Sequence, residues 1–317
     1  MLATAQSRDQ KQRVGLKHIV VGTDFSGASA RALAYGFFIA RQFGSDVSIV
    51  HALAPEPREI VTWDPLPREL DRPRLEAEQE LKRLAQKAPA TSSKPETRLE
   101  KGRVWDVLSS VIQRENTDLV ILGTRGRGGL GKLALGSVAE EVLHQSPCPV
   151  LTVGPNVPDT DSEQLEFKTI LFATDFGPAS AKAFPYALAL AEECNSKLIL
   201  LHMVPHLPAV DGPVAYCPGV YAAEEIIEWQ TETRQESEQK LRRLMPLDAE
   251  LASQPEYVVG VDFVPGGILE AAETRHADLI VMGVNPVPSP RIAAHMPWTL
   301  THDVIRDAKC PVLTVVG

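Results

Sequence analysis

The chain has 317 residues, of which 44% are hydrophobic and 23% charged, a composition typical of soluble globular proteins and a length that suggests two domains. It has no run of eighteen apolar residues and no apolar leader at its start, so we expect no membrane span, no export and a cytoplasmic location. The net charge of −9 gives no support to nucleic-acid binding. The four cysteines form no C-x-x-C pair, which argues against a zinc knuckle and a disulfide framework, so they should be reduced, mostly buried thiols.

Strand-like and helix-like segments alternate along the first half of the chain. Short β-branched runs predict buried strands at residues 18–23, 46–52, 97–102, 118–123 and 149–153. Helical periodicity separates them, most clearly at residues 29–44 and 74–88. Apolar strands that alternate with helices indicate a parallel sheet covered on both faces. We therefore predict an α/β fold with a doubly wound, five-stranded sheet in the order 3-2-1-4-5.

The second half of the chain repeats the first. Residues 18–53 align without a gap on residues 169–204, with twelve of 36 positions identical. The offset grows from 151 to 160 and then to 162, as expected for insertions in loops. We predict two tandem domains of this fold, residues 1–154 and 165–317, with a linker near the Pro-, Asp- and Glu-rich segment 154–167.

A glycine-rich loop, residues 123–137, follows the fourth predicted strand. Ligands of doubly wound sheets bind beyond the carboxyl ends of the strands, where the strand order reverses. In the predicted order this point lies between the first strand, which ends at Asp24, and the fourth, which ends at Gly123. The loop is therefore at the expected ligand position.

Two of the three phosphate-binding patterns that compete for this loop fail. Gly126, Gly128 and Gly131 satisfy G-x-G-x-x-G, but the dinucleotide motif should follow a first strand and precede an acidic residue at the end of the next. Residues 126–133 nearly match the P-loop pattern, but Leu133 stands where a hydroxyl must reach magnesium.

The third pattern, G-x-x-G, nine residues and G-[ST], fits at every spacing through Gly123, Gly126, Gly136 and Ser137. It resembles the nucleotide-binding signature of the universal stress protein family. The resemblance extends to VVGTDFSGAS (20–29), VHAL (50–53) and SPCPVLTV (146–153) and covers both halves, so the chain resembles a tandem universal stress protein. It implies the five-stranded fold argued above and ATP, alone or with Mg²⁺, as the ligand.

The residues of this pattern suit a polyphosphate for physical reasons. Gly123 and Gly126 let the backbone turn sharply and approach phosphates without a Cβ in the way. Gly136 and Ser137 begin a helix whose free N–H groups and positive dipole end attract an anion. The loop adds positive charge from Arg125, Arg127 and Lys132.

The resemblance also implies contacts from neighbouring segments. It places Gly22, Thr23, Asp24 and Ala52 around the adenosine, with Asp24 facing the adenine, and Val138 beside Ser137 at the phosphates. The family often has Pro at the position of Gly22 and Val at that of Ala52. A structural interpretation stays open for two of these features: Asp24 as a cap of the helix near Ala28, and the arginines as a solvated basic loop.

The second half departs from the signature. Gly283 is kept, but Pro286 stands at the second glycine, and Trp298 and Thr299 stand at the third glycine and the serine. Proline lacks an amide donor, and an indole fills the space of a phosphate. Residues 1–154 hold 21 Lys+Arg and 18 Asp+Glu, a net charge of +3, whereas residues 155–317 hold 11 and 23, a net charge of −12, which would repel a triphosphate. We predict that this half does not bind ATP in the family's manner.

No metal site and no catalytic residue are predicted. His295, His302 and Asp303 fit no standard metal-binding spacing, and His51 and His144 are expected to be packed or surface residues. No general base and no second acidic magnesium ligand are evident near the loop.

The function expected from these features is that of a stress-response regulatory or binding module that holds ATP in its first half. A slow Mg-dependent ATPase and a nucleotide-free structural dimerising protein are the alternatives. The resemblance implies pairing through the fifth strands, within the chain and between the two CPVLTV segments, and a homodimer is the further assembly to test.

Overall fold

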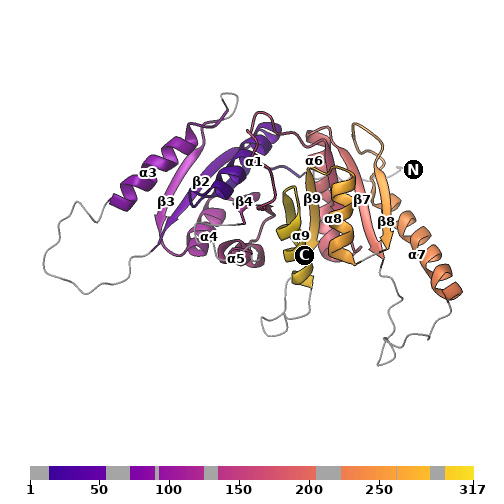
Figure 1. The fold of residues 1–317 in the computed structure, drawn as a ribbon. Coiled ribbons are helices and arrows are strands. Elements are labelled where there is room, and N and C mark those ends of the chain that lie inside the picture. Colours follow the sequence, from indigo (N-terminus) through magenta and orange to yellow (C-terminus); the bar gives the residue numbers. More distant parts are fainter. Residues whose placement is uncertain are drawn as a thin grey trace, which may run out of the picture.

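Strands and helices alternate in both halves of the computed structural model, which describes residues 14–54, 72–89, 93–124, 135–204, 223–261, 263–285 and 297–317 (Figure 1). The first half contains β1 (His18–Gly22), α1 (Gly27–Phe43), β2 (Asp46–Leu53), α3 (Arg72–Ala85), β3 (Glu96–Lys101), α4 (Val104–Glu115), β4 (Leu119–Gly123), α5 (Ser137–Gln145) and β5 (Val150–Val153). The second half contains β6 (Thr169–Ala173), α6 (Pro178–Glu193), β7 (Lys197–Val204), α7 (Ala223–Leu244), β8 (Glu256–Val261), α8 (Val264–Thr274), β9 (Leu279–Val284), α9 (Pro297–Asp307) and β10 (Val312–Val316).

The strands form one ten-stranded sheet in the order β3-β2-β1-β4-β5-β10-β9-β6-β7-β8. All pairs within each half are parallel, so each half has the order 3-2-1-4-5. This confirms the predicted α/β fold and strand order. Among the described residues, no helix combines the length and the apolar character that crossing a bilayer requires.

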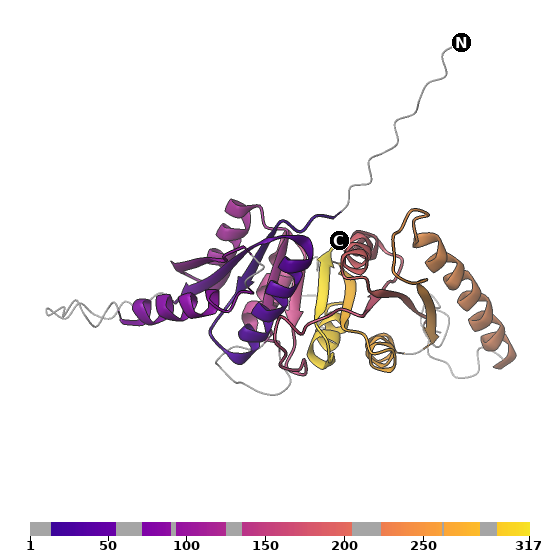
Figure 2. The same ribbon diagram turned by 90° about the horizontal axis from the view of Figure 1, so that it is seen from above.

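Helices cover both faces of the sheet, and each face has its own apolar core. Helices α1, α3, α6 and α7 contribute to one core, which includes Phe38 and Phe172. Helices α4, α5, α8 and α9 contribute to the other, which includes Leu108 and Ile305. Figure 2 shows the two layers of helices on either side of the strands. Successive residues of β1 alternate between the cores, as expected for strands buried on both faces.

The two halves meet at β5 and β10, the only antiparallel pair of the sheet as the structure describes it. Leu151 lies opposite Leu313, and the register is symmetric about this pair. The Thr152 hydroxyl donates to the Val312 carbonyl (3.1 Å), and the equivalent Thr314 hydroxyl donates to the Val150 carbonyl (3.2 Å). The contact therefore has a local pseudo-twofold axis, across which equivalent residues of the two halves make matching contacts.

The segment that connects the halves, residues 154–167, packs against the core on one face of the sheet. Val157, Leu165 and Phe167 are buried in the core that contains α1 and α6. The Phe167 ring lies edge-on to Phe38, with 4.8 Å between centroids. The segment predicted to be a linker therefore contributes to the core as well as joining the halves.

Three of the four cysteines lie in described segments, and all three are free thiols. Burial raises the pKa of Cys148, and it raises the pKa of Cys194 and Cys310 to about 12. Thiols that stay protonated react slowly. Of the three, only Cys310 is fully buried, whereas Cys148 and Cys194 are half-buried. Cys217 lies outside the described residues.

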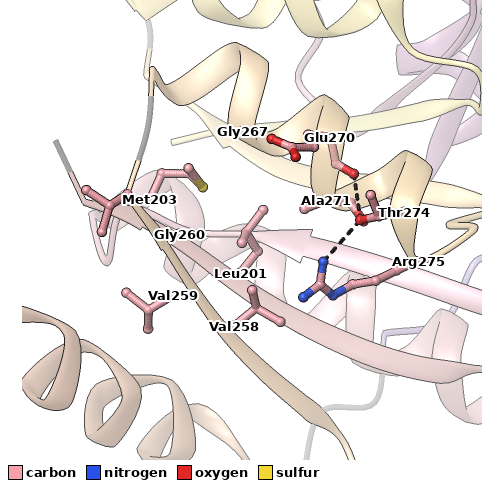
Figure 3. Close-up of a pocket in the computed structure, with 11 residues that line it drawn as sticks. Leu201, Met203, Val258, Val259, Gly260, Gly267, Glu270, Ala271, Thr274 and Arg275 are labelled. Carbon is pink, nitrogen blue, oxygen red and sulfur yellow. Dashed lines mark hydrogen bonds between the residues drawn. The ribbon is translucent and has the colours of Figure 1, made fainter. Parts of the chain in front are cut away.

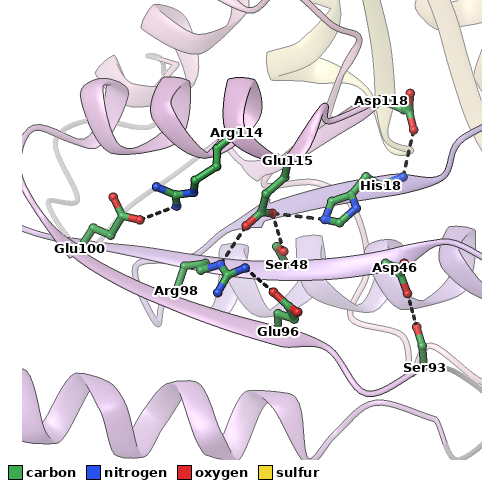
Figure 4. Close-up of polar contacts among 10 residues, drawn as sticks. All are labelled: His18, Asp46, Ser48, Ser93, Glu96, Arg98, Glu100, Arg114, Glu115 and Asp118. Carbon is green, nitrogen blue, oxygen red and sulfur yellow. Dashed lines mark hydrogen bonds and ion pairs between the residues drawn. The ribbon is translucent and has the colours of Figure 1, made fainter.

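A polar cluster lies near the amino ends of β1, β2 and β3, beside the end of α4 (Figure 4). The predicted ligand position is at the opposite, carboxyl edge of the sheet. The side chain of Glu115, at the end of α4, is only 7% exposed. It accepts from Arg98 Nε (2.8 Å) and from the Ser48 hydroxyl (2.7 Å), and His18 Nε2 lies 3.2 Å away. Burial alone would raise the pKa of Glu115, but these hydrogen bonds and the nearby positive charge outweigh it and lower the pKa.

We expect Glu115→Gln to lower the free energy of unfolding by about 1–3 kcal/mol at pH 7, because it removes the charge while leaving the buried partners in place. The folded-state pKa is below the unfolded one, so this stabilisation is present above pH of about 4.3 and is lost as the pH falls through the folded pKa. Urea unfolding of both proteins between pH 7 and pH 3 measures the difference.

The matched control is Glu96→Gln, because Glu96 also pairs with Arg98 but is 61% exposed. Exposed ion pairs contribute little, so this control should stay within about 1 kcal/mol of the parent. Equal losses in the two variants, or a loss at Glu115 that does not shrink in acid, would contradict this account of the cluster.

Candidate functional site

The turn after β1 is built from Thr23 to Ser26. The Thr23 amide donates to the Val50 carbonyl of β2 (2.9 Å), and Asp24 Oδ1 accepts from the Ser26 amide (3.0 Å). The Ser26 hydroxyl accepts from the Ser29 amide (3.3 Å) and caps α1. The N-cap of α1 is therefore Ser26 and not Asp24, which lies half-buried at the carboxyl edge of the sheet.

An aromatic residue in the left-handed backbone region fixes this turn. Phe25 has φ of 63°, which is rare for a bulky residue, and its ring lies 4.3 Å from the His51 ring between centroids. His51 Nδ1 donates to the Thr23 carbonyl (2.7 Å). The second half repeats the arrangement, with Phe176 at φ of 61° and the His202 Nδ1 2.8 Å from its carbonyl acceptor. In the sequence, this arrangement of a phenylalanine and a histidine was visible only as identical residues in the two halves. Because both halves contain it, it belongs to the repeated fold and does not distinguish them.

The two ends of the glycine-rich loop meet beside β4. Thr124 is buried, its amide donates to the Val153 carbonyl (3.1 Å), and its carbonyl accepts from the Gly136 amide (2.9 Å). A Cβ on Gly136 would lie 2.9 Å from that Thr124 oxygen, so the position has little room for a side chain. Sequence reasoning did not identify Thr124, which joins the end of β4 to the start of α5.

Gly123 has a packing requirement of its own. A Cβ there would lie 2.6 Å from the carbonyl carbon of Ala28 in α1. In the second half, a Cβ on Gly283 would lie 2.2 Å from the carbonyl carbon of Ala179 in α6. A glycine at the end of the fourth strand therefore lets the first helix lie close to the sheet in both halves. This explains why Gly283 persists where the rest of the signature is absent.

Three of the predicted residues face the same side of the sheet. A Cβ on Gly22 would point toward Leu122 and Leu108, in the core beneath α4 and α5. Ala52 and Val138 are half-buried and pack against the same core. These three residues therefore lie on the face of the sheet that α4 and α5 cover.

The predicted residues that the structure describes gather at the carboxyl ends of adjacent strands. β1 and β4 are hydrogen-bonded neighbours. The Gly136 amide, just before α5, donates to the carbonyl of Thr124, just after β4. The residues concerned are Gly22, Thr23 and Asp24 after β1, Gly123 at the end of β4, and Gly136, Ser137 and Val138 at the start of α5, with Ala52 near the end of β2. Arg125, Gly126, Arg127 and Lys132 lie outside the described residues.

The corresponding turn of the second half uses its aspartate differently. Asp175 Oδ1 accepts from the Gly177 amide (2.8 Å) and from the Ser180 hydroxyl (2.6 Å). In the first half the equivalent Ser29 hydroxyl donates to the Ser26 carbonyl (3.0 Å), and Ser26 itself caps the helix. Asp175 therefore binds the helix terminus that a serine caps in the first half.

The start of α9 also differs from that of α5. The N-cap of α5 is Gly136, whereas α9 begins at Pro297, so its equivalent, Trp298, belongs to the helix. Pro286 and the side chains of Trp298 and Thr299 lie outside the described part of the chain.

A cavity of about 280 Å³ lies elsewhere in the second half, between β7, β8 and α8 (Figure 3). Its lining includes Val258 and Gly260 of β8. In the first half the equivalent positions of β3 carry Arg98 and Glu100, which pair with groups on α4. None of the predicted site residues that the structure describes lines the cavity.

The sequence matches the model of the universal stress protein family twice, at residues 15–154 and 166–316. The chain belongs to the universal stress protein family. The two matches and the repeated strand order make it a tandem universal stress protein, as the resemblance of its motifs implied.

Curated universal stress proteins resemble one half or most of the chain. One from Thermus aquaticus is 32% identical over 137 residues, which cover 43% of this chain and 98% of that protein. One from Mycobacterium bovis is 26% identical over 228 residues, which cover 67% of this chain and 74% of that protein. A solved universal stress protein from Archaeoglobus fulgidus has the same fold along its length, with a TM-score of 0.64 at 21% identity and coverage of 96% and 97%.

We expect Gly123→Ala and Gly283→Ala each to lower the free energy of unfolding by about 1–3 kcal/mol, because each added methyl forces a helix away from the sheet. Thermal and denaturant unfolding of the full chain measures both. The comparison is with Gly27→Ala, since a Cβ at Gly27 meets no atom within 4 Å and its cost should be small. A destabilisation at Gly123 no greater than at Gly27 would refute the packing role.

Proposed function

We propose that this protein is a cytoplasmic stress-response regulatory module that binds ATP in its first half, residues 1–154, and not in its second half, residues 165–317. Nucleotide binding would bias conformation or assembly, which requires that ATP have different affinities for two states. The chain would act as a covalent pair of family domains joined through β5 and β10.

The observation that carries the proposal is the convergence of three separate segments at one edge of the sheet. The turn Gly22–Asp24, the end of β4 and the start of α5 adjoin one another through the β1–β4 pairing and the bond between Gly136 and Thr124. The first amides of a helix have no partner within it and, with the helix dipole, attract a phosphate. The exposed Ser137 hydroxyl adds a donor at this helix terminus.

The assignment to one half rests on differences between the two crevices. The Ser180 hydroxyl donates to Asp175, whereas the equivalent Ser29 hydroxyl donates to the Ser26 carbonyl. In the signature, Pro286 and Trp298 replace two glycines. The charge difference, +3 against −12, favours a polyphosphate in the first half.

We expect one equivalent of ATP per chain, measured by calorimetric titration of nucleotide-free protein. Ser137→Ala should weaken binding about fivefold to tenfold, the effect of one lost hydrogen bond of about 1–1.5 kcal/mol. Ser137 is the preferred position because it is exposed, whereas a side chain at Gly136 would also press on Thr124. Thr299→Ala, the matched change in the second half, should leave affinity unchanged.

Two equivalents of ATP, or equal losses in the Ser137 and Thr299 variants, would contradict the unequal halves. Complete absence of binding would favour the nucleotide-free structural protein. ADP and AMP titrated in parallel separate recognition of the adenosine from recognition of the outer phosphates.

Hydrolysis distinguishes the regulatory module from a slow ATPase. We expect phosphate release from Mg-ATP at the background rate, because no residue of the glycine-rich signature is a general base; Glu140, the acidic residue in the first turn of α5, is the position to substitute if release is detected. Release well above background that is abolished in Arg127→Ala or Ser137→Ala would establish the ATPase instead. The same variants must be compared at saturating ATP, so that weak binding is not taken for slow turnover.

A further inference from the structure

The pseudo-twofold contact brings ionisable side chains from both halves together. α5 and α9 lie on the same face of the sheet, next to the β5–β10 pair (Figure 1). Glu140 is eight residues before Cys148, and His302 is eight residues before Cys310, so the two occupy equivalent positions of the repeat. The pseudo-twofold axis near Leu151 and Leu313 therefore relates the position of Glu140 to that of His302.

Two histidines and one glutamate form a compact cluster at this place. Glu140 and His144 are four residues apart on α5, so they share one face of the helix. The His302 ring of α9 lies 6.3 Å from the His144 ring between centroids, at an interplanar angle of 85°. One potential donor atom from each of the three side chains lies within 4.8 Å of the other two.

We propose that Glu140, His144 and His302 bind a divalent transition-metal ion, with Zn²⁺ as the reference ion, and thereby link the two halves of the chain. Two imidazole nitrogens and one carboxylate oxygen suit Zn²⁺, Ni²⁺ or Co²⁺, whereas Mg²⁺ and Ca²⁺ prefer oxygen ligands throughout. Three protein ligands leave at least one coordination position for water or an external group.

The geometry needs only side-chain adjustment. In a tetrahedral site with bonds of about 2.0–2.1 Å, the ligand atoms lie about 3.3 Å apart, so the donors must move closer by at most about 1.5 Å. Glu140 and His144 are exposed and His302 is partly exposed, which gives the ion access from solvent. The backbone positions of α5 and α9 can therefore stay as they are.

The positive charge of Arg306 on α9 is offset by neighbouring carboxylates. Arg306 occupies the repeat position equivalent to His144, one turn beyond His302. Its guanidinium is held by Asp303 (2.8 Å) and Asp307 (2.7 Å), which offset its charge. A dimer of either half alone would place Glu140 against Glu140 or His302 against His302, so the mixed ligand set arises from the tandem arrangement.

The test is a zinc titration of the full chain, freed of metal with a chelator and of any affinity tag, by calorimetry and by competition with a chromogenic indicator. We expect one equivalent per chain. His302→Ala, His144→Ala and Glu140→Gln should each weaken binding about tenfold or more, by analogy with the losses that follow damage to other metal sites. His276→Asn is the control, because it removes an exposed imidazole elsewhere and asparagine tolerates its φ of 52°.

Co²⁺ gives an independent signature, since bound Co²⁺ should show visible absorption bands that disappear in His302→Ala. Zinc affinity that is the same in the parent, His302→Ala and Glu140→Gln would overturn the proposal, as would no binding by the parent. Glu140 is exposed, so Glu140→Gln keeps the test decisive if a histidine variant fails to fold. ATP is absent throughout, so the outcome is independent of the proposed nucleotide function.

Discussion

The antiparallel pair of β5 and β10 is the contact on which the arrangement of this protein depends. It turns two five-stranded sheets into one and covers the edge that each half would otherwise expose. Because Thr152 and Thr314 make equivalent hydrogen bonds across it, the two halves meet with local twofold symmetry. The same symmetry brings α5 of the first half and α9 of the second half together on one face of the sheet.

Helix α5 connects the two places where we propose ligands. Its start lies at the end of β4, through the bond between Gly136 and Thr124. Its last two turns carry Glu140 and His144 to the contact between halves. α9 is the equivalent helix of the second half, and it carries His302 and Arg306 at the positions of Glu140 and His144. It begins at Pro297, two positions before the equivalent of Ser137. The two halves therefore share one fold but differ in the residues that these helices carry.

Much of the fold could be predicted from the sequence because it depends on local patterns. Short β-branched runs predict buried strands, and the sequence repeat at an offset of 151 residues predicts that both halves have the same fold. The candidate site residues were placed at one edge because parallel strands end together. The cap of α1 was harder to predict, since Ser26 and Asp24 both suit such a position and only the turn geometry selects Ser26.

Features that depend on contacts between distant segments were not predictable. The demand for glycine at Gly123 comes from the backbone of α1, which no local pattern reveals. His144 is exposed, as expected of a surface residue, but its approach to His302 was not predictable, because His302 is 158 positions away in the sequence and the two meet only through the β5–β10 register. The burial of Phe167 in the connecting segment likewise depends on rings from α1.

Amide hydrogen exchange of the full chain, followed by mass spectrometry with and without saturating ATP, tests the central claim of one fold with unequal crevices most directly. The account predicts slower exchange on adding ATP at residues 22–24, 123–124 and 136–139, with no change at residues 173–175, 283–285 and 297–301. Protection of the second set, or of both sets equally, would contradict it.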